Sequence, residues 1–482
     1  MRITINKRIA KQLTIIVISC LTIQSCALFK TPQKEADTRL PEAFQEGKTD
    51  TVNSAQLKWN DFFEDPYLVN LIDSALANNK ELNIVMQKIN IANNEVKARK
   101  GEYLPFVGAK IGADVDKVGT YTRNGAIEEG LDMANGKEFP KFLGNFQFGL
   151  FASWELDVYK KLRNAKNAAV MEYMATIDGK NFLTTNLIAE VADSYYELVA
   201  LDNQLKNLEE NIKIQQNALD MVKQLQQSAR VNSLAVKRFE AEVEKNKSEL
   251  FRVKQEITVT ENNINFLTGK TSQTILRSDS NFISLTPKVI ETGIPSQLLE
   301  NRPDIRQAEN ELLASKLNIK VAKAKFFPSF GIQTGVGYQA FNIKYLINSP
   351  ESILFNLAGD IIAPLVNFNA IKAEYKTANA KQVQAAYEYE KTIINAYREV
   401  ANQLSNVDNM QRSYEHQNRQ VGLLTESIDI SKQLFQSARA DYMEVLLTQR
   451  DALEAKNSLI ETKKEQMNAM VNLYKALGGG WQ

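Results

Sequence analysis

Histidine and cysteine are nearly missing from this chain of 482 residues, which has one His and two Cys. The histidine, His416, lies in a polar stretch, while Cys20 and Cys26 both lie near the N-terminus. Zinc sites are built mainly from several His and Cys ligands, and Cys/His catalysis needs both groups together. The composition therefore excludes both kinds of site, and we interpret His416 as an ordinary polar residue.

Carboxylates are plentiful, but they are not gathered in one place. The 57 Asp and Glu residues are scattered along polar segments at the spacing of helical ion pairs. Carboxylate-based hydrolysis is compatible with this composition, yet no loop holds a recognisable pair of acids. We therefore expect a protein that is not an enzyme and that has no catalytic cofactor or metal.

An excess of charge of either sign is also missing, because 58 Lys and Arg balance the acids to a net charge of +1. Surfaces that bind nucleic acid are basic and interleave aromatic side chains with the cations. The sequence has no such pattern, so we expect no nucleic-acid partner.

Proline is rare and unevenly placed. The chain has 11 Pro, with none in 141–286 and none in 365–482. A proline inside a helix costs about 3 kcal/mol. Both spans can therefore carry unusually long helices.

The first 25 residues have the pattern of a signal peptide, in which basic residues precede an apolar run too short to cross a bilayer. The segment Ile23–Cys26 resembles a bacterial lipobox, which predicts a lipid on Cys26 and a membrane anchor. Val17–Cys20 fits the same pattern with a shorter apolar core, so Cys20 is the alternative. An ordinary signal with incidental cysteines is a third interpretation. A disulfide between two cysteines of one leader is disfavoured.

The mature chain is a tandem duplication. The heptapeptide QLQQSAR at 224–230 returns as QLFQSAR at 433–439, and Gly269 and Gly478 stand at the same offset of 209 residues. Upstream segments repeat at an offset of 223 residues, so the first copy holds an insertion, which we place in a loop at 118–140. Two long repeats indicate pseudo-two-fold symmetry. We assign 1–25 to the signal peptide, 26–66 to a lipidated N-terminal segment, 67–286 to the first repeat and 287–482 to the second.

Apolar residues alternate with glycine or polar residues in 107–115, 146–156, 330–338 and 355–365. This period predicts four strands of the length that a tilted transmembrane β-strand requires. Soluble hairpins packed on the helices are the alternative. Four strands cannot close a barrel, and an open strand edge is costly in lipid. We therefore expect the protein to oligomerise.

The remaining segments have the period of helices. A helix is expected from 68 to 100, before Pro105, and long polar helix pairs are expected in 159–266 and 368–477. Their apolar stripe is thin, as in a coiled coil. The repeated heptapeptide then lies where each outgoing helix turns into a returning one.

Several motifs occur in a specific order along the chain: FFEDPYL at 62–68, SWELD at 153–157, LLENRPDIR at 298–306 and LYKALGGGW at 473–481. With them the chain resembles the TolC-like outer-membrane channels, in particular the lipoprotein branch that serves resistance-nodulation-division (RND) efflux pumps. The resemblance implies a homotrimer whose strands form one twelve-stranded barrel, continued into the periplasm as a tunnel of coiled helices. It also implies two partners, a periplasmic adaptor and an inner-membrane RND pump.

The family's tip helix carries an acidic pattern that residues 442–450 resemble. Glu444 matches one acidic position, whereas the other, an aspartate in relatives, is Leu447 here. The resemblance implies that Glu444 and Leu447 lie at the periplasmic gate, where one ring of glutamates would favour cations. A solvated helix charge is the alternative for Glu444, and the constriction could then lie at Asp441 or Tyr442.

The two turns are expected at the periplasmic tip, where the adaptor docks. The residues assigned to this surface are Ser228, Arg230, Ser437 and Arg439. The leading hypothesis is thus a passive exit duct for solutes in the outer membrane. An exit duct for type I protein secretion and a coiled-coil surface lipoprotein without a channel are the alternatives.

Overall fold

The computed structural model describes residues 33–44, 51–132, 136, 138, 140–278, 282–366, 368–437 and 439–482. Both cysteines, and so the proposed lipid anchor, lie outside these residues. The chain forms two units, of which the first contains Ala92–Tyr173 and Glu311–Tyr387. The second contains Ala36–Ile91, Met174–Asn310 and Glu388–Gln482. Each unit therefore contains parts of both sequence repeats, and the bounds assigned to the repeats stay a prediction.

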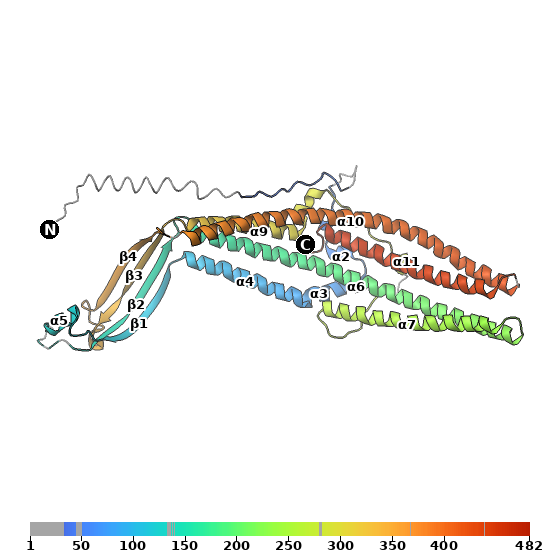
Figure 1. Ribbon diagram of the computed structural model, residues 1–482, viewed down its shortest axis with the longest axis horizontal. Coiled ribbons are helices and arrows are strands. Elements are labelled where there is room, and N and C mark those ends of the chain that lie inside the picture. Colours follow the sequence, from blue (N-terminus) through green and yellow to red (C-terminus); the bar gives the residue numbers. More distant parts are fainter. Residues whose placement is uncertain are drawn as a thin grey trace. The chain divides into compact units, whose positions relative to one another are not determined.

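The first unit holds an antiparallel sheet of four strands (Figure 1). The strands are β1 (Phe106–Asp116), β2 (Leu143–Leu156), β3 (Ser329–Ala340) and β4 (Ile353–Ile362), and they are paired in that order. The predicted strands are confirmed. Because β1 and β2 come from the first copy and β3 and β4 from the second, the β2–β3 pairing joins the two repeats.

The register of the sheet gathers apolar side chains on one face. Leu150 is paired with Val336, and Val336 with Phe355, so the three form a row across neighbouring strands. All three side chains are at least half exposed in the protomer. An apolar sheet face without cover in a single chain is the surface that a lipid bilayer can solvate.

The loop between β1 and β2 contains a short helix, α5 (Arg123–Glu129), where the sequence pattern indicated only irregular structure. Thr122 begins this helix, because its hydroxyl accepts a hydrogen bond of 3.2 Å from the Gly125 amide. A threonine N-cap satisfies an amide that would otherwise lack a partner.

The long helix pairs are confirmed. In the first copy, α6 (Lys161–Gln227) is followed by α7 (Ser233–Leu267), and in the second, α10 (Asn369–Gln436) is followed by α11 (Tyr442–Ala476). Figure 1 shows the α6–α7 and α10–α11 turns at the same end of the second unit. Among the described residues, no helix is both long enough and apolar enough to cross a membrane.

The helix expected at 68–100 is two helices, α3 (Pro66–Asn78) and α4 (Lys80–Tyr103), so that prediction was wrong at Asn79. The Asn79 side chain causes the break by two bonds. Its Oδ1 accepts from the Leu82 amide at 3.0 Å, and its Nδ2 donates to the Leu267 carbonyl at 3.0 Å. An N-cap of this kind starts a new helix.

The second copy has the same break between α8 (Leu298–Asn301) and α9 (Pro303–Ala324). Here Arg302 takes the place of the asparagine, and its guanidinium donates to the Ala476 carbonyl at 2.9 Å. In both copies the residue at the break thus binds the last turn of the returning long helix.

A glycine ends each returning helix in the left-handed region, with φ of 69° at Gly269 and 93° at Gly478. A Cβ at Gly269 would lie 2.5 Å from the Asn78 carbonyl oxygen, and one at Gly478 would lie 2.5 Å from that of Asn301. Both glycines therefore form the C-cap of a returning helix, one in each copy.

The remaining short elements lie in the connecting segments of the chain. They are α2 (Trp59–Phe62) and the 3-10 helices η1 (Ser54–Gln56), η2 (Phe282–Ser284), η3 (Pro295–Gln297) and η4 (Ile343–Tyr345). Phe62 of α2 stacks on Tyr474 of α11 at 4.0 Å between ring centroids, and the Tyr474 hydroxyl donates to the Leu57 carbonyl at 2.5 Å. Aromatic stacking therefore fixes the segment before α3 to the core of the second unit.

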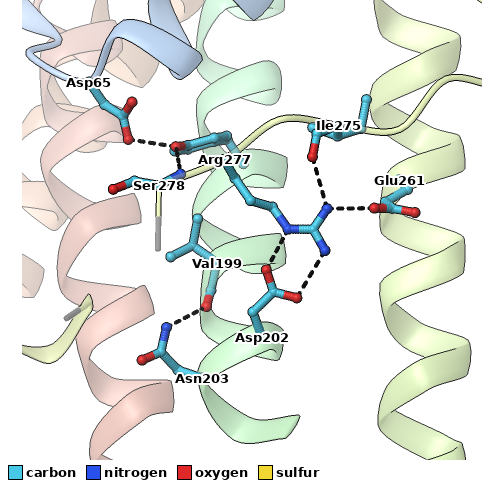
Figure 2. Close-up of polar contacts among 9 residues, drawn as sticks. Asp65, Val199, Asp202, Asn203, Glu261, Ile275, Arg277 and Ser278 are labelled. Atoms are coloured by element: carbon cyan, nitrogen blue, oxygen red, sulfur yellow. Dashed lines mark hydrogen bonds and ion pairs between the residues drawn. The ribbon is translucent and has the colours of Figure 1, made fainter. Parts of the chain in front are cut away.

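The segment after α7 is held by charge (Figure 2). The Arg277 guanidinium pairs with Asp202 of α6 and with Glu261 of α7, and it donates to the Ile275 carbonyl at 3.0 Å. Asp65 accepts a hydrogen bond of 2.5 Å from the Tyr195 hydroxyl. The connection between the repeats is therefore anchored to both helices of the first pair.

Lys463 of α11 is a buried cation, with 2% of its surface exposed. Its Nζ donates to Gln466 at 2.9 Å and lies 4.4 Å from the centre of the Tyr414 ring. No carboxylate pairs with it in the described part of the chain. Burial lowers the pKa of Lys463 to about 8.

We expect Lys463→Met to stabilise the protein at pH 7 by about 2 kcal/mol, because Met fills similar space without a charge to desolvate. The lysine of the unfolded chain has a pKa of about 10.4, so Lys463 loses its proton at a lower pH in the native protein than in the unfolded one. The free energy of unfolding of the wild type therefore rises between about pH 8 and pH 10. The advantage of the variant should shrink over that window. Denaturation followed by circular dichroism at several pH values measures it, with the exposed Lys381→Met as control. A constant advantage up to pH ~10.5 would contradict this account.

Candidate functional site

The turn between α6 and α7 is a Schellman motif, in which two amides close the end of the outgoing helix. The Arg230 amide donates to the Leu225 carbonyl at 2.9 Å, and the Ala229 amide donates to the Gln226 carbonyl at 2.9 Å. Ala229 has a φ of 57°, in the left-handed region that this motif requires. The turn stops the helix with an alanine where glycine is usual.

The turn between α10 and α11 has the same bond, from the Arg439 amide to the Leu434 carbonyl at 2.8 Å. The serines also match, since Ser228 Oγ donates to the Gln224 carbonyl at 3.1 Å and Ser437 Oγ donates to that of Gln433 at 3.0 Å. The repeated heptapeptide is therefore a helix-stop sequence, and its serines satisfy carbonyls at the helix end.

The four residues assigned to docking are all exposed: Ser228, Arg230, Ser437 and Arg439. The serine hydroxyls are engaged locally, as described above. Within the ranges that the structure describes, neither arginine has an ion pair. The two turns therefore present free guanidinium groups, which suit an acidic or carbonyl-rich partner surface.

The two returning helices begin differently. Asn232 caps α7, because its side chain accepts a hydrogen bond of 3.1 Å from the Ala235 amide. Asp441 occupies the same position before α11, but its side chain makes no cap hydrogen bond. The Asp441 carboxylate is exposed and stays available for other interactions.

One face of α11 is uncovered in the protomer, and it includes Glu444 and Leu447. The exposed positions recur at helical spacing: Asp441, Glu444, Leu447, Asp451, Glu454 and Ser458. We call these residues the α11 stripe. Arg450 lies 3.1 Å from Asp451 and 4.0 Å from Glu454, so its positive charge partly neutralises these two carboxylates. Sequence reasoning missed Asp451 and Glu454, although their spacing from Glu444 was a signal for one face.

Tyr442 does not belong to the α11 stripe. Its half-buried ring lies 6.5 Å from the ring of Phe239 on α7, beside a buried cluster that includes Val236 and Leu446. The structure thus groups Asp441, Glu444 and Leu447 on one exposed face and turns Tyr442 toward the neighbouring helix pair.

Charge also ties α6 to α7 beside the first turn. Glu240 lies 2.9 Å from Lys237 and 3.4 Å from Lys223. The hydrogen bond from Lys237 lowers the pKa of the Glu240 carboxyl. In the part of the chain that the structure describes, no group of three or more His, Cys, Asp or Glu side chains is arranged to hold a metal ion.

The family model described as "Outer membrane efflux protein" matches residues 71–270 and 294–479, which include both hairpins and both helix turns. The chain belongs to this family. Membership confirms the resemblance that the sequence motifs indicated.

Known relatives extend over nearly the whole chain. It is 27% identical over 466 residues to the cation efflux system protein CusC of Escherichia coli O6:H1, covering 96% of this chain and 97% of CusC. It is 26% identical over 476 residues to the probable outer membrane lipoprotein SilC of Salmonella typhimurium, covering 98% and 99%. The open-state structure of the Neisseria gonorrhoeae MtrE outer membrane channel covers 94% of this chain and 98% of its own, with a TM-score of 0.82 and 23% identity. That likeness shows the fold.

The protein is an outer-membrane efflux channel with a helical tunnel and a β-barrel, as the resemblance implied. The exposed apolar sheet face and the paired helices are the parts of one protomer that such a channel needs. The members of this outer-membrane efflux family act as ducts. Neither the gate nor the docking residues are tested by these similarities, and both stay predictions.

Proposed function

We propose that this chain, as a homotrimer, is the exit duct of a tripartite efflux system and conducts solutes passively across the outer membrane. An inner-membrane RND pump supplies the solutes and the energy, and a periplasmic adaptor joins the pump to the duct. The observation that carries the proposal is the sheet, because its apolar face is exposed and its edge strands β1 and β4 are each paired on one side only in the described part of the protomer. Such edges need further strands in lipid. The chain itself catalyses no reaction.

Solute efflux is favoured over type I protein secretion because CusC, which matches nearly the whole chain, is named for cation efflux. A cation or another small solute is therefore the class of cargo that we infer. The choice of cargo within that class belongs to the pump, since a wide duct makes few contacts with what passes through it.

The α11 stripe is the part of the protomer that suits a gate. Glu444 and Asp441 lack a cation in the described part of the chain, whereas Asp451 and Glu454 share Arg450. Three copies of Glu444 around an axis would concentrate negative charge in a confined space, where charges interact more strongly than in bulk water. Leu447, one turn further on, would add an apolar collar.

We expect Glu444→Gln to lower the preference of the open channel for cations without changing assembly. Under a gradient of KCl across a planar bilayer, the reversal potential should move toward zero. The matched control is Glu426→Gln, which changes an exposed glutamate of α10. An unchanged reversal potential and conductance would place Glu444 outside the pore, and the absence of any channel would contradict the proposed function itself.

A lipid on Cys26 is proposed from the lipobox, and the similarity to SilC, a probable lipoprotein, supports it. We expect Cys26→Ser to abolish incorporation of labelled palmitate while the purified protein still forms trimers, because strand pairing rather than the lipid joins the protomers. Cys20→Ser is the control and should keep the label. Label that persists in Cys26→Ser and disappears in Cys20→Ser would move the anchor to Cys20.

The two helix turns are proposed to dock on the adaptor. Arg230 and Arg439 are exposed at equivalent positions of the two copies, and the motif that holds them is nearly identical. A trimer would repeat this pair of turns around its axis. The adaptor would therefore meet a ring of similar cationic turns.

A further inference from the structure

Residues 33–44, which contain no helix or strand, are bound to α10, and we call them the N-terminal strap. In the first unit, Gln382 of α10 binds the backbone of the strap. The Lys34 amide donates to Gln382 Oε1 at 3.1 Å, and Gln382 Nε2 donates to the Lys34 carbonyl at 2.6 Å. Gln382 is 0% exposed, and Lys34 Nζ lies 4.5 Å from the centre of the Tyr387 ring. One residue of the strap thus satisfies both ends of a buried amide.

Two further contacts hold the strap in the second unit. The Asp37 amide donates to Glu390 Oε1 at 2.8 Å. The Phe44 ring stacks on the Tyr397 ring, with 5.6 Å between the centroids. The contacts therefore follow one another in the same order along the strap and along α10. The N-terminal end of the strap thus points back toward the start of this helix.

The chain before the strap has a limited reach. Cys26 is eight residues before Lys34, and residues 27–32 lie outside the described ranges. A chain of eight residues spans at most about 28 Å. Gln382 is 13 residues after Asn369, the first residue of α10, which corresponds to about 20 Å of helix. While Gln382 holds the strap, Cys26 can therefore reach the start of α10 but not much further.

The start of α10 is also where the edge of the bilayer is expected. β4 ends at Ile362, and the next apolar residues, Leu365 and Val366, are 76% and 86% exposed. Exposed apolar side chains at the end of a barrel strand suit contact with lipid. The reach of Cys26 thus matches the distance from Gln382 to the end of the sheet.

We propose that Gln382 is a positioning residue for the lipid anchor, which it holds at the edge of the bilayer beside β4 of the same protomer. The inference rests on the proposed lipid on Cys26. Docking of the strap and insertion of the lipid are then coupled by the length of the chain between them. A lipid on Cys20 would not be coupled in this way, because 14 residues span up to about 48 Å.

Hydrogen exchange of the strap, followed by mass spectrometry on the lipidated protein in nanodiscs, tests the proposal. Gln382→Ala should speed the exchange by about tenfold or more, because the strap loses two hydrogen bonds. Gln384→Ala, at an exposed position of α10, is the control and should change nothing. Deleting residues 28–32 should also speed the exchange, because the three remaining residues span only about 10 Å. Inserting five Gly and Ser residues after Thr31 should leave the exchange unchanged.

The lipid distinguishes this coupling from a local effect of the deletion. Cys26→Ser, expressed behind a secretory signal that is cleaved before position 26, has no lipid, so the same deletion should then leave the exchange slow. Fast exchange in that protein, or slow exchange in the lipidated deletion variant, would overturn the proposal. Labelled palmitate is measured in the same samples. A Cys26 without label would refute the lipid anchor and the inference together, whereas label with unchanged exchange would refute the inference alone.

Discussion

Gly478→Ala is expected to destabilise the protein by about 3 kcal/mol, because the new Cβ atom would both strain the backbone and clash with neighbouring backbone atoms. With a φ of 93°, Gly478 has a backbone conformation that an L side chain rarely adopts. Its new Cβ would also lie 2.5 Å from the Asn301 carbonyl oxygen and 3.0 Å from the Arg302 nitrogen. Both contacts are to backbone, so no flexible side chain can move away. A lower midpoint of thermal unfolding, followed by helical circular dichroism, measures the loss.

Two other glycines are matched to this variant. Gly269→Ala should cost a similar amount, because Gly269 has a φ of 69° and its Cβ would lie 2.5 Å from the Asn78 carbonyl oxygen. Gly422→Ala should instead stabilise by about 0.5–1 kcal/mol, because Gly422 lies inside α10 with nothing within 4 Å of its Cβ. If Gly478→Ala and Gly422→Ala behave alike, the close approach to Asn301 does not matter for stability.

The strands and long helices could be predicted because their signals are local and periodic. Alternation marks β1 to β4, and the absence of proline marks the span that contains α6 and α7. The break at Asn79 could not be predicted from periodicity. It depends on a bond from Asn79 to the Leu267 carbonyl, 188 residues away in the chain. A tertiary contact there overrides a sequence pattern that continues through the break.

The candidate site was predictable to a similar extent. Duplication located both helix turns, and the Schellman bonds explain why the heptapeptide recurs. The orientation of α11 was not accessible from the sequence, because its apolar and polar residues are interleaved. Burial of Val445 and Gln449 fixes which face remains exposed, and with it the positions of Asp451 and Glu454. The same burial leaves the Gln449 amide without a hydrogen bond to any residue that the structure describes.

Duplication does not make the two copies identical at the helix break. Asn79 is neutral, whereas Arg302 brings a charge that is 4% exposed. The Arg302 guanidinium binds both oxygens of Asp304, at 3.0 and 2.6 Å, and Glu399 at 2.8 Å. Its remaining contact, to the Ala476 carbonyl, is the one shared with the first copy. Arg302 thus connects α9, α10 and α11 in the second unit.

Arg302→Met is expected to cost about 3 kcal/mol, since removing one partner of a buried ion pair leaves the other charge uncompensated. Most of this loss of stability comes from Asp304, because its side chain is only 16% exposed. The Glu399 side chain is 39% exposed and can be solvated by water instead. Adding Asp304→Asn to the variant should therefore recover about half of the loss, by removing the unpaired carboxylate. Arg412→Met is the control, because its pair with Asp408 is exposed and contributes only about 0.5 kcal/mol. Midpoints of chemical denaturation of the four proteins decide the matter, and a double variant no more stable than Arg302→Met would show that lost packing, rather than the buried charge, accounts for the effect.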